Sequence, residues 1–239
     1  MIVSNEIFFI SNFSKMKFKN FLTCLVVLLC GFLSFAQNSS LGLWAIYFGN
    51  QTFSKNWNWW TETQYRSHEI IPDTNQFLVR TGIGYNLTEN NNNILLGYAF
   101  IHSENYQTGN PDKIKTQEHR IYQQFITRQQ FNRFFIQHRY RLEQRFLQDD
   151  FRMRLRYFLA LNYPLNKEKL EKNAVYLSAY NEIFLNTEPR IFDRNRIYGG
   201  LGYSFSKNTR LELGYMNQSL ENKNTNQMMI TLINNINLQ

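Results

Sequence analysis

Cysteine is almost missing from this sequence. Of its 239 residues only two are cysteines, and both, Cys24 and Cys30, lie within the first 36 residues. An exported chain without cysteine in its main body is not a disulfide-stapled scaffold, and it has neither thiol chemistry nor a thiolate metal site. The histidines show no HxH or HExxH spacing. The sequence therefore predicts no metal and no cofactor.

Proline and long apolar runs are also scarce. There are four prolines and no Gly/Ser-rich tract, so nothing in the composition marks a linker between domains. After Gln37 no segment approaches the roughly 18 apolar residues of a transmembrane helix. We therefore expect a single domain over residues 37–239 that contains no transmembrane helix.

The first 36 residues have the pattern of a secretory signal peptide. Lys17 and Lys19 precede an apolar run over residues 21–35, and Ser34 and Ala36 supply the small residues of a cleavage site. A membrane anchor is disfavoured because the run is shorter than the roughly 20 residues needed to span a bilayer. Met16 is a plausible true start, because the segment MKFKN makes a better signal opening than the residues before it.

A lipoprotein signal is rejected, because Leu29 stands before Cys30 where a small residue is needed. The formal charge of +8 falls to about +6 once Lys15, Lys17, Lys19 and Glu6 leave with the signal peptide. Basic chains can bind nucleic acid, but an exported chain rarely meets it, and these arginines are not clustered in a tail. We expect no nucleic-acid partner.

Alternation of polar and apolar residues fills the rest of the chain, and it predicts strands, since side chains alternate faces only in extended structure. In residues 137–146 one series holds Arg139, Arg141, Glu143 and Arg145, and the other is largely apolar. Eleven such segments follow one another: residues 41–49, 57–68, 77–87, 94–103, 116–128, 133–147, 151–163, 174–185, 194–206, 210–219 and 227–238.

The connections alternate as well, with mostly short polar turns at one end and generally longer segments, such as 69–76 and 105–115, at the other. This is the pattern of an up-and-down antiparallel barrel. Bacterial barrels normally have an even strand number. We therefore expect ten or twelve strands, which requires that one of the eleven segments is not a strand or that a loop hides another strand. The remaining explanation of the odd number is that the first strand closes the barrel in parallel.

Three features favour an outer-membrane barrel, with apolar residues facing lipid and charges facing the lumen. Ten to twelve strands enclose more volume than an apolar lining readily fills. The charged face uses arginine, which pairs with carboxylates in confined space, more than lysine. Aromatic residues make up 16% of the chain, and those near strand ends predict an interfacial girdle: Trp44, Trp57, Tyr106, Tyr163 and Tyr215. The final residues, Leu238 and Gln239, are an imperfect assembly signal because the last strand does not end on an aromatic residue.

The segments HRYRLEQRF, FRMRLRYFLALNYPL, LSAYNEIFLN, FDRNRIYGGLGYSFS and LELGYMNQ resemble an outer-membrane barrel family known as domain of unknown function 2490. The likeness runs from Leu41 to the end of the chain. It implies a monomeric barrel in the outer membrane of a Gram-negative envelope, with membrane lipid and the barrel-assembly machinery as partners. It brings no activity, substrate or catalytic residue.

The candidate site is a ladder of charges lining the lumen. It is an anion site if the arginines are in surplus and a structural filling if they are paired, and pairing is the more common case in small barrels. The ladder consists of Arg139, Arg141, Glu143, Arg145, Arg152, Arg154, Arg156, Arg194, Arg196, Glu182, Glu62 and Arg66. Further members on the same faces are Arg80, Arg120, Arg210, Glu118 and Glu212.

Catalysis has little support in the sequence. His138 falls on the apolar face whereas Ser178 and Ser204 fall on lumen faces, so no serine–histidine pair is visible. We expect no enzyme, and a barrel with a structural role or one that passes small solutes or anions passively. Two alternatives stay open: a lipid-modifying outer-membrane enzyme, and a soluble exported barrel that binds an apolar ligand.

Overall fold

The computed structural model describes residues 41–88, 91–107 and 110–238. The predicted signal peptide lies outside these residues. The described chain forms β-strands joined by turns and loops: β1 (Leu41–Thr52), β2 (Trp57–Ser67), β3 (Thr74–Asn86), β4 (Asn92–Gln107), β5 (Asn110–Phe131), β6 (Phe134–Leu147), β7 (Phe151–Pro164), β8 (Val175–Asn186), β9 (Phe192–Ser204), β10 (Thr209–Leu220) and β11 (Asn224–Asn237).

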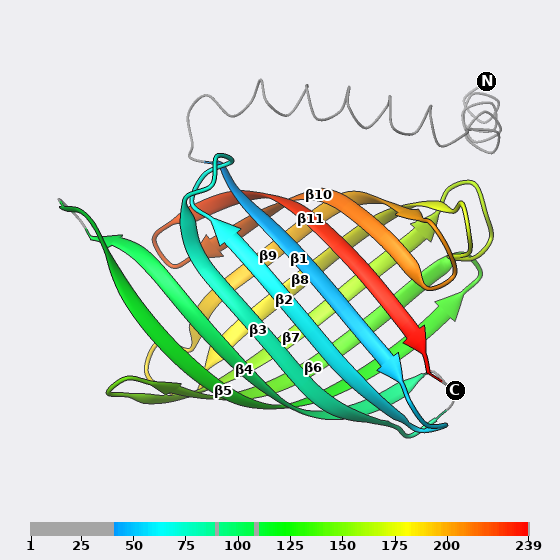
Figure 1. Cartoon of the computed structure of the whole chain (residues 1–239), viewed down its shortest axis with the longest axis horizontal. Helices are drawn as coiled ribbons and strands as arrows, with labels where there is room; N and C mark the ends of the chain where they lie inside the picture. The colour runs from blue at the N-terminus through cyan, green and yellow to red at the C-terminus, as the bar shows by residue number, and fades with distance from the viewer. Residues whose placement is uncertain (1–40, 89–90, 108–109, 239) are drawn as a thin grey trace.

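The strands close into one barrel in which each strand pairs antiparallel with its neighbours in sequence (Figure 1). The exception is the seam, where β1 and β11 pair in parallel from Leu41↔Asn226 to Thr52↔Asn237. The described chain has eleven strands, which agrees with the expected range of about ten to twelve. The preference for an even number is wrong, and the remaining explanation, that the first strand closes the barrel in parallel, is confirmed. With an odd number the first and last strands run in the same direction, so only a parallel pairing can close the sheet.

We name the two ends of the barrel by the termini. The amino end is where β1 begins at Leu41, and the carboxyl end is where β11 finishes at Asn237, on the right in Figure 1. Connections 53–56, 132–133, 165–174 and 205–208 lie at the carboxyl end, and connections 68–73, 148–150, 187–191 and 221–223 lie at the amino end. The prediction that one end carries the longer connections is wrong.

The prediction of the connection lengths fails mainly at the hairpin of β4 and β5. The segment 105–115 was predicted to be a loop, but strand pairing continues through Tyr106↔Lys113. Both faces of this extension are polar or exposed, so the hydrophobic alternation ends before the backbone pairing does. The hairpin therefore projects beyond the neighbouring strands at the amino end, as seen on the left of Figure 1.

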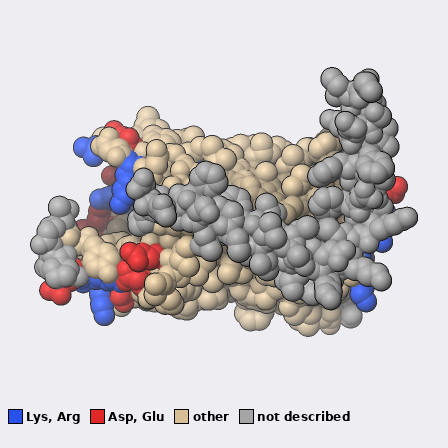
Figure 2. All heavy atoms as spheres, turned by 90° about the horizontal axis from the view of Figure 1, so that it is seen from above, with Lys and Arg blue, Asp and Glu red and all other residues tan. Residues whose placement is uncertain are grey.

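The exterior of the barrel is apolar between its ends. Along β7, Leu155, Leu159 and Leu161 are exposed, and Ile197 on β9 and Ile230 on β11 are exposed in the same way. Figure 2 shows this from one side, with charged residues gathered at the two ends and other residues between them. Arginine and glutamate fill the interior instead. The prediction that apolar residues face outward and most charged residues face the lumen is therefore confirmed.

None of the described residues forms a helix of the length and apolarity that crossing a membrane requires.

Interior glycines make room for tyrosine rings. A Cβ atom at Gly202 would overlap the ring of Tyr176, and one at Gly97 would overlap Tyr122. In the segment GGLG a Cβ at Gly200 would meet the Tyr198 hydroxyl, whereas one at Gly199 would have nothing within 4 Å. Glycine on the inner face of a strand lets another side chain lie flat against the backbone, which explains the glycines of β9.

Candidate functional site

Glu143 on β6 is the centre of the ionic network inside the barrel. Its side chain is completely buried, and it accepts hydrogen bonds from Arg154 at 2.6 Å and from Arg156 at 2.5 Å. Arg141 and Arg120 lie slightly further away, with nitrogen–oxygen distances of 3.6 and 3.7 Å. A carboxylate buried without water needs such partners to remain charged.

Glu182 on β8 is the second centre. It accepts from Arg139 at 2.7 Å and from Arg156 at 2.5 Å, while Arg196 lies 3.6 Å away. Arg156 therefore bridges Glu143 and Glu182. Charge-assisted bonds of this length are the strong ones, and a guanidinium can hold two carboxylates because its donors are fixed in a plane.

Strand register explains why these residues meet. Residues two apart on a strand share a face, so Arg139, Arg141 and Glu143 all point into the lumen. Across strands, Glu143 is opposite Arg154 and Glu182 is opposite Arg196. Directly opposite side chains are close enough to pair.

Glu62 and Glu118 inside the barrel also pair with arginines. Glu62 pairs with Arg80, which is opposite it on β3. Glu118 accepts from Arg120 at 2.7 Å and from Arg145 at 2.6 Å. Each of these acids is buried or nearly so, and each has an arginine partner.

Two ladder residues differ from their predicted positions. Arg152 was expected in the lumen, but its side chain is 54% exposed at the amino end and binds Asp150 at 2.6 Å. Arg194 is partly exposed and binds Asp193 at 3.0 Å. Both lie near the start of their strands, where alternation still holds but the barrel no longer covers the side chain.

Sequence reasoning missed Asp193 and Trp44. Asp193 accepts from Arg154 at 2.8 Å, although simple alternation on β9 puts it on the opposite face from Arg194. A register shift at Phe184/Leu185 on the neighbouring strand accompanies this change, and no pattern in the sequence marks it. Trp44 was assigned to an interfacial girdle, but it is buried in the interior.

Trp44 lies between two arginines that are only partly neutralised. The guanidinium carbon of Arg66 is 3.8 Å from the centre of the Trp44 ring, and that of Arg196 is 4.9 Å away. Arg66 donates to the amide oxygens of Gln64 and Gln76. In the described part of the chain no carboxylate oxygen lies within 4.0 Å of its guanidinium.

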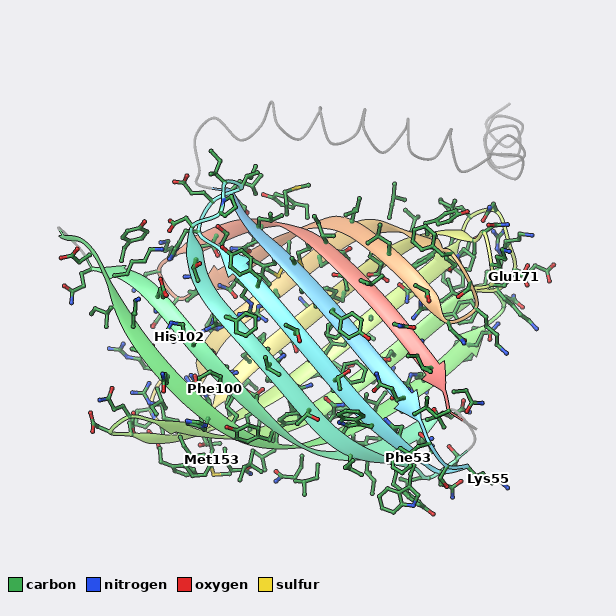
Figure 3. All side chains as sticks on the ribbon, viewed as in Figure 1. Phe53, Lys55, Phe100, His102, Met153 and Glu171 are labelled. Atoms are coloured by element: carbon green, nitrogen blue, oxygen red, sulfur yellow. The ribbon has the colours of Figure 1, made fainter. Side chains whose placement is uncertain are left out.

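A cavity of about 1180 Å³ opens at the carboxyl end of the lumen and extends inward to Trp44 on β1 and Arg66 on β2. Its deep wall includes Trp44, Arg66 and Arg196, and it reaches Lys55 and Lys207 in exposed turns at the carboxyl end. Figure 3 shows Lys55 at that end, on the turn after β1. The cavity is therefore a vestibule with its mouth at the carboxyl end.

Cations outnumber acids on the wall of this vestibule. Among the described residues, nine cationic side chains line it against three carboxylates, Glu62, Glu182 and Glu212, which leaves a surplus of six. Within the described residues, the buried Nε atoms of Arg80 and Arg210 make no hydrogen bond. The nine cations are Lys55, Arg66, Arg80, Arg128, Arg139, Arg156, Arg196, Lys207 and Arg210.

The lumen beside β3 to β6, towards the amino end, is filled with side chains instead. Leu78, Ile101 and Tyr122 form an apolar cluster with essentially no exposure, and the fully buried Glu143 lies in the same region with its arginines. Part of the ladder thus packs in the filled region, while Arg139, Arg156, Arg196, Glu182, Glu62 and Arg66 line the vestibule.

The histidines and serines of the described chain make other contacts. His119 pairs with Tyr98 at 2.6 Å and His138 with Tyr157 at 2.9 Å, all on the exterior. Ser178 donates to Glu212 inside the barrel at 3.2 Å. No group of three or more potential metal ligands occurs among the described residues.

Comparison with protein families gives a match over residues 41–229 to the family described as "Protein of unknown function (DUF2490)". The matched region begins with β1 and extends into β11. No curated protein and no solved structure matches the chain.

Proposed function

The chain belongs to the DUF2490 family of proteins of unknown function, and from this premise we propose that it is an outer-membrane β-barrel whose lumen admits small anions. In this proposal the protein reaches the membrane through its signal peptide and the barrel-assembly machinery. It works there as a monomer, in contact with membrane lipid and without enzymatic activity.

The exterior of the barrel supports the membrane part of the proposal. Large apolar side chains such as Leu155 and Ile197, which are 50% and 59% exposed, lie on strands whose inner face carries buried arginines. A soluble barrel has the reverse arrangement, because it hides its apolar side chains from water. This argues against the soluble exported alternative.

The charge surplus of the vestibule carries the functional part of the proposal. A concave wall with nine cations and three carboxylates concentrates anions, because the low-dielectric walls focus the field of the unpaired charges. The packed region towards the amino end opposes free conduction through the barrel. We therefore propose a vestibule that anions enter and leave at the carboxyl end.

A lipid-modifying enzyme has less support. The exterior histidines His119 and His138 hydrogen-bond to tyrosines, and Ser178 lies inside the barrel. A leaflet substrate would need a nucleophile on the outside, within hydrogen-bonding reach of its base. Unchanged lipid composition in a deletion strain is the expected result.

Trp44 provides a test of anion entry. In a variant with Trp57→Phe, Trp59→Phe and Trp60→Phe, Trp44 is the remaining tryptophan and it lines the deep wall of the vestibule. In lipid vesicles we expect iodide to quench its fluorescence several times more strongly than caesium at equal ionic strength. Equal quenching by both ions, or none by iodide, would contradict the proposal.

A further inference from the structure

We propose that the vestibule binds an amphipathic anion, with its charged head at Arg66 and Arg196 and its apolar body along the inner wall of the β1–β11 seam. This inference rests on the proposed function, because it names the class of anion that the same cavity takes. The ligand class is a single-chain molecule with one anionic group.

The inner wall at the seam is apolar, which a purely aqueous vestibule does not require. Trp44, Ile46, Tyr198 and Met229 pack together with Met216 as a buried cluster, and Phe48 and Tyr180 pack against it. All but Met216 line the cavity. Apolar surface facing water in a cavity is unfavourable, and an apolar ligand body removes that cost.

Stacked rings continue this wall around the lumen. Tyr180 and Tyr198 stack with centroids 4.7 Å apart, and Phe158 lies 5.0 Å from Tyr180. On the other side of the seam, Phe48 lies 5.5 Å from Trp60. Aromatic and aliphatic side chains therefore line the vestibule on β7, β8, β9, β11, β1 and β2.

Charges line the vestibule around the rest of its wall and at its deep end. Arg128 and Arg139 come from β5 and β6, which lie across the barrel from the seam, and Arg80 comes from β3, two strands from β1. At the deep end, Arg66 and Arg196 are both 7% exposed and flank Trp44. Among the described residues, the hydrogen-bond acceptors of Arg66 are amide oxygens, so its charge remains available to an anion.

Glu182 limits the charge available at Arg196, because its carboxylate lies 3.6 Å from that guanidinium. The head is therefore placed closest to Arg66. The amide partners of Arg66 hold its guanidinium in a fixed orientation, which lowers the entropic cost of binding.

The dimensions of the vestibule suit one such molecule. Strand β1 spans about 20 Å along the barrel axis between Thr52 at the mouth and Trp44, at roughly 3.3 Å per residue and a tilt of about 40°. The volume of about 1180 Å³ is slightly above the usual range for small-molecule sites. An extended apolar chain with a single charged head fits a space of this length that has Arg66 and Arg196 at its deep end.

The test uses the Trp44-only variant in lipid vesicles and a ligand that quenches on contact. The probe is 12-bromododecanoate, and its neutral counterpart is 12-bromododecan-1-ol. We expect the carboxylate to quench Trp44 at concentrations about tenfold lower than the alcohol. Bromoacetate, which has the head without the chain, should need concentrations at least about tenfold higher than the long carboxylate.

Variants locate the head. Arg66→Gln should weaken binding of 12-bromododecanoate about tenfold or more, and Arg66→Lys should restore part of it, since hydrogen bonds to a charged group are lost in the first and one cation is kept in the second. Arg152→Gln, at the exposed amino end, should leave binding unchanged. Each variant is first required to keep the heat-modifiable gel band of the folded barrel.

The outcomes separate this inference from the proposed function. If iodide quenches Trp44 but the long carboxylate acts no better than the alcohol or bromoacetate, the vestibule accepts anions and the amphipathic ligand is wrong. Equal binding by Arg66→Gln and the parent variant would likewise overturn it. If neither iodide nor the carboxylate reaches Trp44, both proposals fail.

Discussion

At the scale of single residues, the interior depends on a few carboxylates that each hold several arginines. Glu182 is bonded to Arg139 and Arg156 and lies near Arg196, so its removal would leave three guanidiniums close together with less compensating charge. Breaking a buried ion pair by removing one partner is far more costly than losing a surface pair.

Replacing Glu182 with glutamine should therefore lower the free energy of unfolding by about 3 kcal/mol or more. The measurement is the urea midpoint of the folded, heat-modifiable form in detergent. The matched control is Glu171→Gln in the β7–β8 connection, labelled in Figure 3, where the carboxylate is 54% exposed and 3.6 Å from Lys167. We expect that change to stay within about 0.5 kcal/mol; equal effects would refute the central role of Glu182.

A second residue-scale feature holds the projecting hairpin. Asp73, in the connection after β2, accepts hydrogen bonds from Lys113 and, at 3.0 Å, from Tyr106. The hydrogen bond from Lys113 holds the pKa of the Asp73 carboxyl below its usual value of 3.8. Because the pKa is lowered in the folded protein, this contribution to stability is present above pH 3.8 and disappears as the pH falls below it.

Hydrogen exchange in residues 104–107 and 110–117 should report this tether. At pH 6 we expect faster exchange in Asp73→Asn than in the parent chain, after correction for intrinsic rates. The difference should shrink as the pH falls through the pKa of the folded carboxyl, because the parent chain loses the same charge. Asp149→Asn, at an exposed position of the same end, serves as the control. A difference that persists undiminished at the lowest pH would contradict this account.

Much of the ionic site could be predicted from alternation alone. Arg139, Arg141 and Glu143 were assigned to the lumen because residues two apart share a face, and their burial agrees. The prediction for Arg152 is wrong because alternation does not say where the barrel stops covering a strand. The prediction for Trp44 is wrong because an aromatic residue near a strand end fits either a membrane interface or the interior wall of a barrel.

At the scale of elements, the strands depend on close contacts between glycine and tyrosine. Gly199 and Gly202 lie three positions apart on β9, on opposite faces. Gly202→Ala should lower stability by about 1–3 kcal/mol because the new methyl group collides with the Tyr176 ring. Gly199→Ala has free space within 4 Å and should change little. Equal urea midpoints for the two variants would show that the ring does not need this gap.

The parallel seam is the second feature of this scale. Ala45 on β1 is opposite Ile230 on β11, and both are exposed. Paired strands are about 4.8 Å apart, which is within disulfide range, and the chain has no cysteine after Cys30. Ala45→Cys with Ile230→Cys should therefore form a disulfide under mild oxidation.

The control for this cross-link combines Ala45→Cys with Ile236→Cys. Ile236 lies six positions beyond Ile230 on β11, about 20 Å further along the strand. That pair should not cross-link. Cross-linking in the control, or its failure in the matched pair, would contradict the parallel register.

The strands themselves were predictable, but their ends and closure were less so. Eleven segments were recognised because each carries an alternating pattern with one apolar face. The β4–β5 hairpin continues past this pattern because backbone pairing needs no apolar face once the strands leave the barrel wall. The preference for an even strand number failed because it describes other barrels, whereas closure here is set by the number of alternating segments.

At the scale of the whole molecule, the lumen has a packed region and a hollow one. The packed region holds Glu143 and the cluster around Tyr122, and the hollow one is the vestibule, which opens at the carboxyl end. The exterior is apolar around both. The central claim is that the outer face lies in lipid while the wall of the vestibule attracts anions from water.

Neighbouring residues on β7 test both parts of this claim in one measurement. Leu159 is exposed on the outer face, and Ala160 lines the vestibule. The measurement is the rate at which single cysteines at these two positions react, in vesicles, with anionic and cationic thiol reagents that do not cross membranes. We expect Ala160→Cys to react several times faster with the anionic reagent and Leu159→Cys to react with neither. Free reaction at Leu159→Cys, or a faster cationic reaction at Ala160→Cys, would contradict the account.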